Sequence, residues 1–212
     1  MTADAEAESP RRRPKGDKRA RTRARIIQAA AELVRENGFE ATTVQAVAQR
    51  AGVSNGAIYG NFKDRDDLFG SIGPTYWPRV QPTFAPNSTF DEKMRAMAEA
   101  TIAAFHARRP MGADRLSGMA YALRNQSLLG RMQNEAAERY DLAAEWWRSV
   151  EDEGPLPMPP ALLVRVLNAL TEGLTLQWLL TPELITDDVV YAAFAALASA
   201  RADAGPVRRP SA

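Results

Sequence analysis

The 212-residue chain contains no cysteine and only one histidine, His106. The absence of cysteine excludes disulfides, thiolate metal sites and cysteine nucleophiles, and it fits a protein of the reducing cytosol. A single histidine argues against a histidine-based metal site or a serine–histidine triad within one chain. The sequence also has no Gly-rich phosphate loop. We therefore expect no enzyme activity, no metal and no cofactor.

Long apolar runs and alternating strand patterns are also missing. No apolar run approaches the roughly 20 residues of a membrane span. The basic stretch near the N-terminus is not followed by an uninterrupted apolar segment, so we expect no signal peptide and no membrane partner. Apolar residues make up 45% of the chain, which is enough for a sizeable core. These features predict a soluble, cytoplasmic protein of helices.

Basic residues are concentrated near the N-terminus, although the formal net charge of the whole chain is only +1. Residues 11–25 include nine lysines and arginines and a single acid, Asp17. Such a block is typical of a segment that contacts an anionic polymer or a membrane surface. Residues 1–18 contain Pro10 and Pro14 and few apolar groups, so we expect a basic arm that is disordered when free.

Helical spacing of apolar residues begins after this arm. The pattern predicts a first helix that ends at Asn37, with Gly38 as a left-handed cap. A short second helix follows, capped by Thr42 or Thr43, and Thr42 with Gln45 has the spacing of a capping box. A third helix, capped by Ser54, is expected to run to about Asn61, and a fourth to open at Lys63-Asp64 and to be weakened or kinked by Gly70, Gly73 and Pro74. Thr89 with Glu92 has capping-box spacing before a helix through about His106, and a break follows at Arg108-Arg109-Pro110-Met111-Gly112. Further helices are expected over about 114–152 with an interruption near Gly130, over 160–180, and after Thr186. Residues 204–212 are expected to be a disordered tail.

Residues 41–68 carry the pattern that points to function. Two short helices are joined by a tight turn at Ala51-Gly52-Val53, which matches a helix-turn-helix. Val47 and Ile58 are expected in the small core that fixes the angle between the helices. The first helix of such a motif lies against the DNA backbone, and the second enters the major groove. The predicted partner is therefore double-stranded DNA.

This region resembles the N-terminal domain of the TetR family of bacterial transcriptional repressors. The resemblance implies an all-α fold, with a three-helix DNA-binding domain over residues 19–66 and a helical bundle for ligand binding and dimerisation over residues 67–203. The run Glu172-Gly173-Leu174 to Leu180 looks like the penultimate helix of the family. The resemblance rests on Asn37-Gly38-Phe39, Ala41-Thr42-Thr43-Val44, Val47-Ala48, Ala51-Gly52-Val53-Ser54, Gly56, Ile58-Tyr59, Phe62, Lys63, Arg65 and Leu68.

The resemblance also implies which residues contact DNA. The recognition helix opens with small and polar residues, whose amides and side chains suit bases and phosphates. Gly60 stands where the family commonly has a larger residue, so one contact is expected to be missing. The candidate DNA-binding residues are Thr43, Ser54, Asn55, Gly56, Tyr59, Gly60, Asn61 and Lys63, together with Arg19, Arg21 and Arg23 of the basic region.

For the body, the resemblance implies a small, mostly apolar effector bound between helices. The candidate lining residues are Trp77, Phe105, Met119, Tyr121, Trp147, Asn168, Thr171 and Trp178. Gln177 is expected as a polar anchor together with Asn168 and Thr171, and His106 is a weaker candidate. The faces of residues 162–180 and 189–200 resemble the family's dimer interface. A homodimer would present two recognition helices to a palindromic operator. The helix from about Asp66 is the expected link through which the effector shifts the population of DNA-competent dimers.

Three other interpretations remain at this level. The same DNA-binding head would serve an activator or a regulator without a ligand. An enzymatic body is disfavoured by the missing chemistry described above. A membrane-surface role for residues 11–25 would show itself as liposome binding without DNA affinity.

Overall fold

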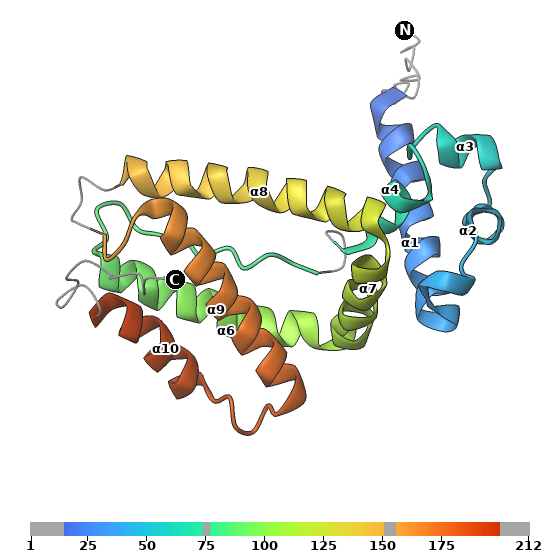
Figure 1. The fold of residues 1–212 in the computed structure, drawn as a ribbon. Helices are drawn as coiled ribbons and strands as arrows, with labels where there is room; N and C mark the ends of the chain where they lie inside the picture. Colours follow the sequence, from blue (N-terminus) through green and yellow to red (C-terminus); the bar gives the residue numbers. More distant parts are fainter. Residues whose placement is uncertain (1–14, 74–76, 151–155, 200–212) are drawn as a thin grey trace, which may run out of the picture. The chain divides into compact units, whose positions relative to one another are not determined.

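The computed structural model describes residues 15–73, 77–150 and 156–199 (Figure 1). All regular structure in these ranges is helical, as the sequence predicts. The chain divides into two compact units, Met1–Ile72 and Gly73–Ala212. The expected boundary between residues 66 and 67 falls inside a helix, and the observed division lies six residues later. Most of the predicted basic arm and the whole predicted tail lie outside the described residues.

The N-terminal unit contains α1 (Lys15–Ala41), α2 (Val44–Ala51), α3 (Asn55–Tyr59) and α4 (Arg65–Gly70). A side-chain oxygen caps each of the three short helices by accepting a backbone N–H, which satisfies one of the unpaired donors at a helix start. The caps are Thr43 to Ala46, Ser54 to Ala57 and Asp64 to Asp67. Gly52 ends α2 in the left-handed conformation at φ 62°.

The core of this unit is built from the apolar faces of its four helices. The fully buried side chains include Ile26 of α1, Val47 of α2, Ile58 of α3 and Leu68 of α4, each at most 1% exposed. One residue from each helix thus meets in a single cluster of apolar side chains. Short helices are marginal in isolation, so this shared burial is what stabilises α3, which has only five residues.

Two details near the end of α1 differ from the sequence prediction. Gly38 has positive φ, as expected, but its ψ of 168° is extended and not left-handed helical, and a short helical segment continues after it to Ala41. The predicted capping box at Thr42 and Gln45 is wrong. The buried Thr42 hydroxyl donates to the carbonyl of Gly38 at 2.7 Å, so Thr43 is left to cap α2.

Within the described residues, the helices of the C-terminal unit follow from residue 90. They are α6 (Phe90–Arg108), the 3₁₀ turn η1 (Arg109–Met111), α7 (Gly112–Arg124), α8 (Gln126–Ser149), α9 (Pro160–Leu180) and α10 (Asp187–Ser199). Thr89 and Glu92 form the capping box predicted for α6. In Figure 1, α10 runs beside α6, and α9 crosses the unit between α6 and α8.

The long helix expected over residues 114–152 is interrupted at Asn125 and not near Gly130. The Asn125 side chain accepts the backbone N–H of Leu128 at 3.1 Å and caps α8. A cap residue satisfies a donor that a break would otherwise leave unpaired, whereas a glycine inside a helix only lowers its stability by about 1 kcal/mol. Gly130 therefore lies within α8.

One apolar cluster holds the C-terminal unit together. It draws on α6, α8, α9 and α10, and its most buried members include Met94, Phe105, Leu163, Val190 and Phe194. Within the described part of the chain, no helix has the length and apolar character needed to cross a lipid bilayer.

Candidate DNA-binding interface

The helices α2 and α3 form the candidate interface in the N-terminal unit. Ser54 accepts the N–H of Ala57 at 3.2 Å, and Thr43 accepts the N–H of Ala46 at 3.1 Å. In each case the hydroxyl oxygen is used as an acceptor, so the hydroxyl proton stays available to donate. Both side chains are exposed, and each can therefore cap its helix and donate to a phosphate at the same time.

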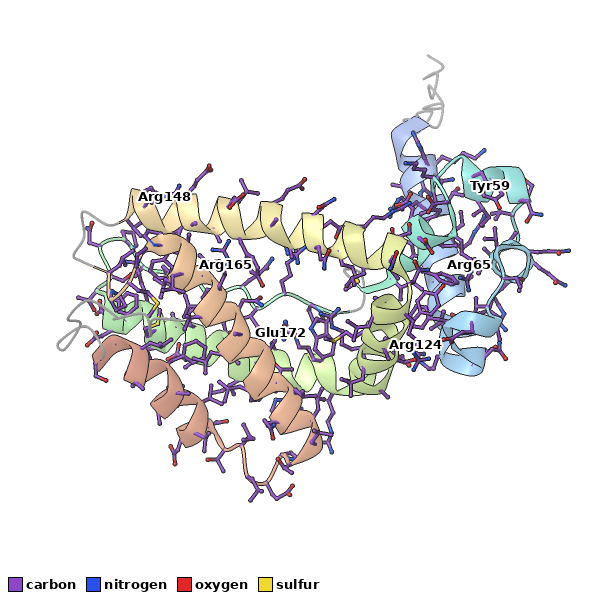
Figure 2. All side chains as sticks on the ribbon, viewed as in Figure 1. Tyr59, Arg65, Arg124, Arg148, Arg165 and Glu172 are labelled. Atoms are coloured by element: carbon purple, nitrogen blue, oxygen red, sulfur yellow. The ribbon has the colours of Figure 1, made fainter. Side chains whose placement is uncertain are left out.

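One face of α3 is open to solvent, and the opposite face is buried. Ile58 is 1% exposed and Tyr59 is 59% exposed, although they are neighbours in the chain. Ser54, Asn55, Gly56 and Gly60 are exposed as well. A large aromatic side chain held in solvent by a buried neighbour suits contact with a groove or a phosphate. Figure 2 labels Tyr59 on α3.

The predicted contact residues Asn61 and Lys63 differ in where their side chains lie. The side-chain amide of Asn61 donates to the carbonyl of Ala57 at 2.7 Å, and its carbonyl oxygen Oδ1 is buried without a partner. The Lys63 backbone N–H donates to Asp67 at 2.8 Å, which leaves the exposed Lys63 ammonium to approach a phosphate. Asn61 thus contributes to the end of α3, and Lys63 keeps the geometry expected for DNA contact.

The three arginines expected in the basic arm belong to α1. Arg19 donates to the carbonyl of Gly60 at 3.1 Å, across 41 residues of sequence. Arg23 donates to Ser71 at 3.0 Å, and its guanidinium lies 4.6 Å from the centre of the Phe62 ring. Arg21 is exposed on the same helix. Helix α1 starts at Lys15, and these contacts hold Arg19 beside the end of α3 and Arg23 beside Phe62 and the end of α4.

Arg65 belongs to the pattern that resembles the family, but no contact was predicted for it. Arg65 donates to the carbonyls of Phe39 and Thr42 at 2.5 and 3.3 Å. It also lies 4.4 Å from the centre of the Phe69 ring. Arg65 therefore links the start of α4 to the segment between α1 and α2. This link helps to hold the helices that precede and follow α3 in place.

The predicted ligand-binding residues fall into separate groups in the C-terminal unit. Six are buried and two, Met119 and Asn168, are exposed. Asn168 donates to the Tyr140 hydroxyl at 2.9 Å. The six buried residues are Trp77, Phe105, Tyr121, Trp147, Thr171 and Trp178.

The structure brings only some of these buried residues together. Phe105 and Trp178 stack with ring centres 4.9 Å apart, while Trp147 packs against Phe84 and Phe90 in a second aromatic group. Tyr121 accepts a long hydrogen bond from Asn125 at 3.4 Å.

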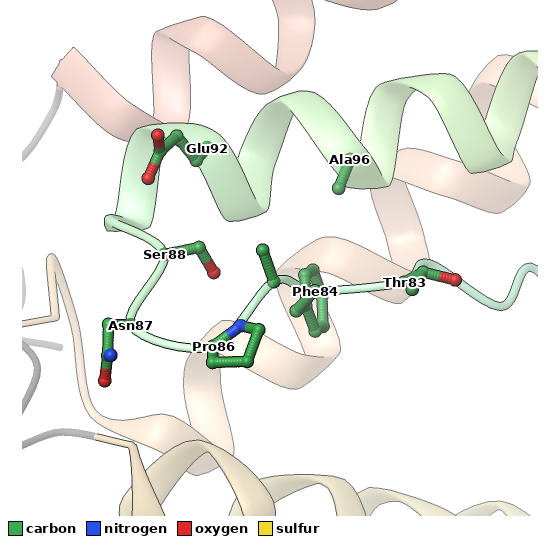
Figure 3. A pocket seen from close by; sticks show the side chains of 8 residues that line it. Thr83, Phe84, Pro86, Asn87, Ser88, Glu92 and Ala96 are labelled. Atoms are coloured by element: carbon green, nitrogen blue, oxygen red, sulfur yellow. The ribbon is translucent and has the colours of Figure 1, made fainter.

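A surface pocket of about 330 Å³ lies between the segment at residues 83–88 and the start of α6 (Figure 3). Most of its lining is exposed loop, with Glu92 and Ala96 from α6. None of the predicted ligand-binding residues lines it. This pocket is therefore separate from the effector site that the sequence predicts.

The N-terminal unit is a helix-turn-helix DNA-binding domain: two short helices joined by a left-handed glycine turn, with the outer face of the second helix in solvent. Residues 26–72 match the family model described as bacterial regulatory proteins, tetR family. Over these residues the chain carries the DNA-binding domain of the tetR family of bacterial regulatory proteins.

Relatives of known name agree with this assignment. The chain is 33% identical over 84 residues to the transcriptional repressor AcnR of Corynebacterium efficiens, an alignment covering 40% of this chain and 44% of that repressor. It is 25% identical over 154 residues to the transcriptional regulator UidR of Escherichia coli, covering 72% of this chain and 79% of UidR.

Solved structures share the fold over most of the chain. Salmonella enterica GusR aligns with a TM-score of 0.63 at 19% identity, over 84% of this chain and 95% of GusR. The complex of SmeT with triclosan aligns with a TM-score of 0.59 at 23% identity, over 91% of this chain and 99% of SmeT. The likeness therefore includes the helices of the C-terminal unit as well as the N-terminal domain.

Proposed function

We propose that this chain is a ligand-responsive repressor that binds a palindromic operator as a homodimer. The observation that carries the proposal is the exposed face of α3, with Tyr59 in solvent and the hydroxyls of Thr43 and Ser54 at the starts of α2 and α3. One such helix contacts only a few base pairs, so a symmetric pair is needed for a specific site. The likeness to AcnR, named a repressor, supports repression. DNA as the partner supports a cytoplasmic location.

An exposed apolar stripe supports the homodimer. Leu162, Leu176 and Leu180 of α9 are 49%, 38% and 62% exposed and lie on one face of the helix by their spacing. Ala169 and Gly173 are exposed on the same face, and a methyl group added at Gly173 would meet no atom within 4 Å. Small residues between leucines allow close approach of a second helix. Val189 at the start of α10 adds to this surface.

The effector is a small molecule bound in the C-terminal unit. SmeT, which shares this fold, has been solved with triclosan. In this chain, the stacked Phe105 and Trp178 supply the apolar surface that such a molecule needs. A ligand that binds more tightly to the state unable to engage DNA lowers the fraction of competent dimers. This coupling gives release of the operator.

A binding selection on random double-stranded DNA tests the proposal. We expect enriched sites to be palindromic, with half-sites about one helical turn apart or more. Tyr59→Ala should lower the enrichment clearly, and Leu142→Ala, at an exposed position of α8, should leave it unchanged. Enrichment of non-palindromic sites, or none above background, would contradict the proposal. Transcription in vitro from a promoter that overlaps the selected site should fall when the protein is added.

A further inference from the structure

Two arginines of the C-terminal unit lie against the same tryptophan ring. The guanidinium carbon of Arg108, at the end of α6, is 4.7 Å from the centre of the Trp77 ring. That of Arg115, in α7, is 5.5 Å from the same centre. Arg108 is 2% exposed, and Trp77 is 9% exposed. Two cations are therefore held on one aromatic side chain, mostly away from water.

Only one carboxylate neutralises this pair within the described part of the chain. Glu172 of α9, labelled in Figure 2, lies 3.3 Å from Arg108. Arg108 also donates to the Thr175 hydroxyl at 3.2 Å and to the Pro78 carbonyl at 3.0 Å. Burial lowers the pKa of the Arg108 guanidinium, and the positive charge of Arg115 lowers it further, against the opposing effect of Glu172. The cluster carries one positive charge in excess.

Among the residues that the structure describes, three hydrogen-bond donors of this cluster find no acceptor. The indole Nε1 of Trp77 and the Nε of Arg115 are both buried and unpartnered. The hydroxyl of Thr171 is also buried and unpartnered, one turn of α9 before Thr175. The N–H groups of Trp77 and Arg115 can only donate, and the hydroxyl of Thr171 can also do so. Buried polar groups are almost always paired, so these three call for an acceptor from outside the chain.

We propose that this cluster, defined as Trp77, Arg108, Arg115 and Thr171, binds the carboxylate of a small organic acid. The inference rests on the effector site of the proposed function and assigns the chemical class of the effector. A carboxylate has two oxygens that accept from the unpaired donors, and its single charge cancels the excess cation. The side chain of Glu172 is 37% exposed, which places one edge of the cluster in contact with solvent.

Matched acids and amides test this assignment on the full chain. The probes are benzoate and benzamide, phenylacetate and phenylacetamide, and hexanoate and hexanamide, each at about 10 mM and equal ionic strength. We expect at least one acid to raise the melting temperature by roughly 2 °C or more, and its amide to raise it far less. Isothermal titration of that acid should give one site per chain. If no pair distinguishes acid from amide, the proposal is overturned.

Variants locate the effect at the cluster. Arg115→Gln should abolish the preference for the acid without lowering the melting temperature of the unliganded protein, because it removes an unpaired cation. Trp77→Phe keeps the ring and removes the N–H, so it should weaken acid binding several-fold. Arg148→Gln makes the same charge change at an exposed site on α8 and should leave acid binding unchanged. Equal loss in Arg148→Gln and Arg115→Gln would overturn the proposal.

Operator release separates this inference from the proposed function. Acids and amides that release DNA equally well, and equally from Arg115→Gln, would leave the repressor intact and overturn the acid assignment. An acid that binds at the cluster but leaves DNA binding unchanged would support the site and contradict its regulatory role.

Discussion

At the scale of single residues, Tyr59 offers the sharpest test of the interface. Its side chain is 59% exposed, so removing it should change DNA contact and leave the fold intact. We expect Tyr59→Ala to weaken affinity for the selected operator roughly tenfold, which corresponds to about 1.4 kcal/mol. Electrophoretic mobility shifts measure the affinity, and the melting temperature should stay within about 1 °C of the wild type.

The Tyr59→Phe variant separates the two contacts that this side chain can make. It should keep affinity if the ring packs on a thymine methyl and lose it if the hydroxyl donates to a phosphate. If Tyr59→Ala binds the operator with wild-type affinity, the assignment of α3 to the DNA interface is wrong.

Thr43 has two roles that substitutions can separate. It caps α2 through the N–H of Ala46, so Thr43→Ala should lower the free energy of unfolding by about 1 kcal/mol in urea denaturation. Thr43→Asn retains a cap acceptor and should restore most of that stability. If the hydroxyl also donates to a phosphate, both variants should weaken DNA binding. Equal stability of Thr43→Ala and Thr43→Asn would show that the cap contributes nothing.

At the scale of helices, local signals were sufficient to predict most of the elements. Ser54 and the pair of Thr89 and Glu92 cap the helices for which the sequence proposed them, because capping involves residues only three apart. The errors arose where two local signals competed. Thr42 lost the cap of α2 to Thr43, and Gly130 lost the break to Asn125.

The contacts that the sequence did not predict are those between residues distant in the chain. Arg19 bonds to Gly60, Arg65 to Phe39, and Arg108 to Glu172, across 41, 26 and 64 residues. No spacing rule connects such positions, since their meeting depends on how helices pack. The stretch Arg108-Arg109-Pro110 indicated only a break in the helix. The burial of Arg108 beside this turn became visible only in the folded structure.

The contact between α1 and α2 has a pH dependence with a definite sign. Arg50 donates to both oxygens of Glu36, at 3.0 and 2.8 Å, and this hydrogen bonding lowers the pKa of Glu36 from its ordinary 4.5. A lowered pKa stabilises the folded state above the ordinary value, and the gain is lost as pH falls through the folded pKa.

We therefore expect Glu36→Gln to melt slightly below the wild type at pH 7. The difference should close as the pH falls below 4.5 and through the lowered pKa of Glu36. Because the pair is exposed, the effect should be small and should shrink further in high salt. Calorimetry over this range measures it, and a gap that persists in acid would contradict the assignment.

At the scale of the whole molecule, the basic block at residues 11–25 should set the salt dependence of DNA binding. Contacts with Gly60, Phe62 and Ser71 hold Arg19 and Arg23 of α1, while Arg11, Arg12 and Arg13 precede this helix in the chain. Replacing Arg11, Arg12 and Arg13 together by glutamine removes these three charges and keeps the acids Asp4, Glu6 and Glu8 of the same segment. We expect the slope of log affinity against log salt to become shallower by about 2–3. An unchanged slope would exclude this segment from the complex, and vesicle binding without DNA binding would favour a membrane role.

Assembly is the property on which recognition of a palindrome depends. Leu180 lies in the exposed stripe of α9, so Leu180→Glu would place two carboxylates near each other across a two-fold axis. Repulsion and the loss of apolar burial should convert the dimer into monomers, as measured by sedimentation equilibrium, and operator affinity should fall with it. Leu142→Glu makes the same change at a site of α8 that is 67% exposed and outside the stripe. Leu142→Glu should leave the dimer intact, because we expect association to depend on the α9 stripe and not on an added charge elsewhere. If both variants stay dimeric, the two recognition helices are joined through another face.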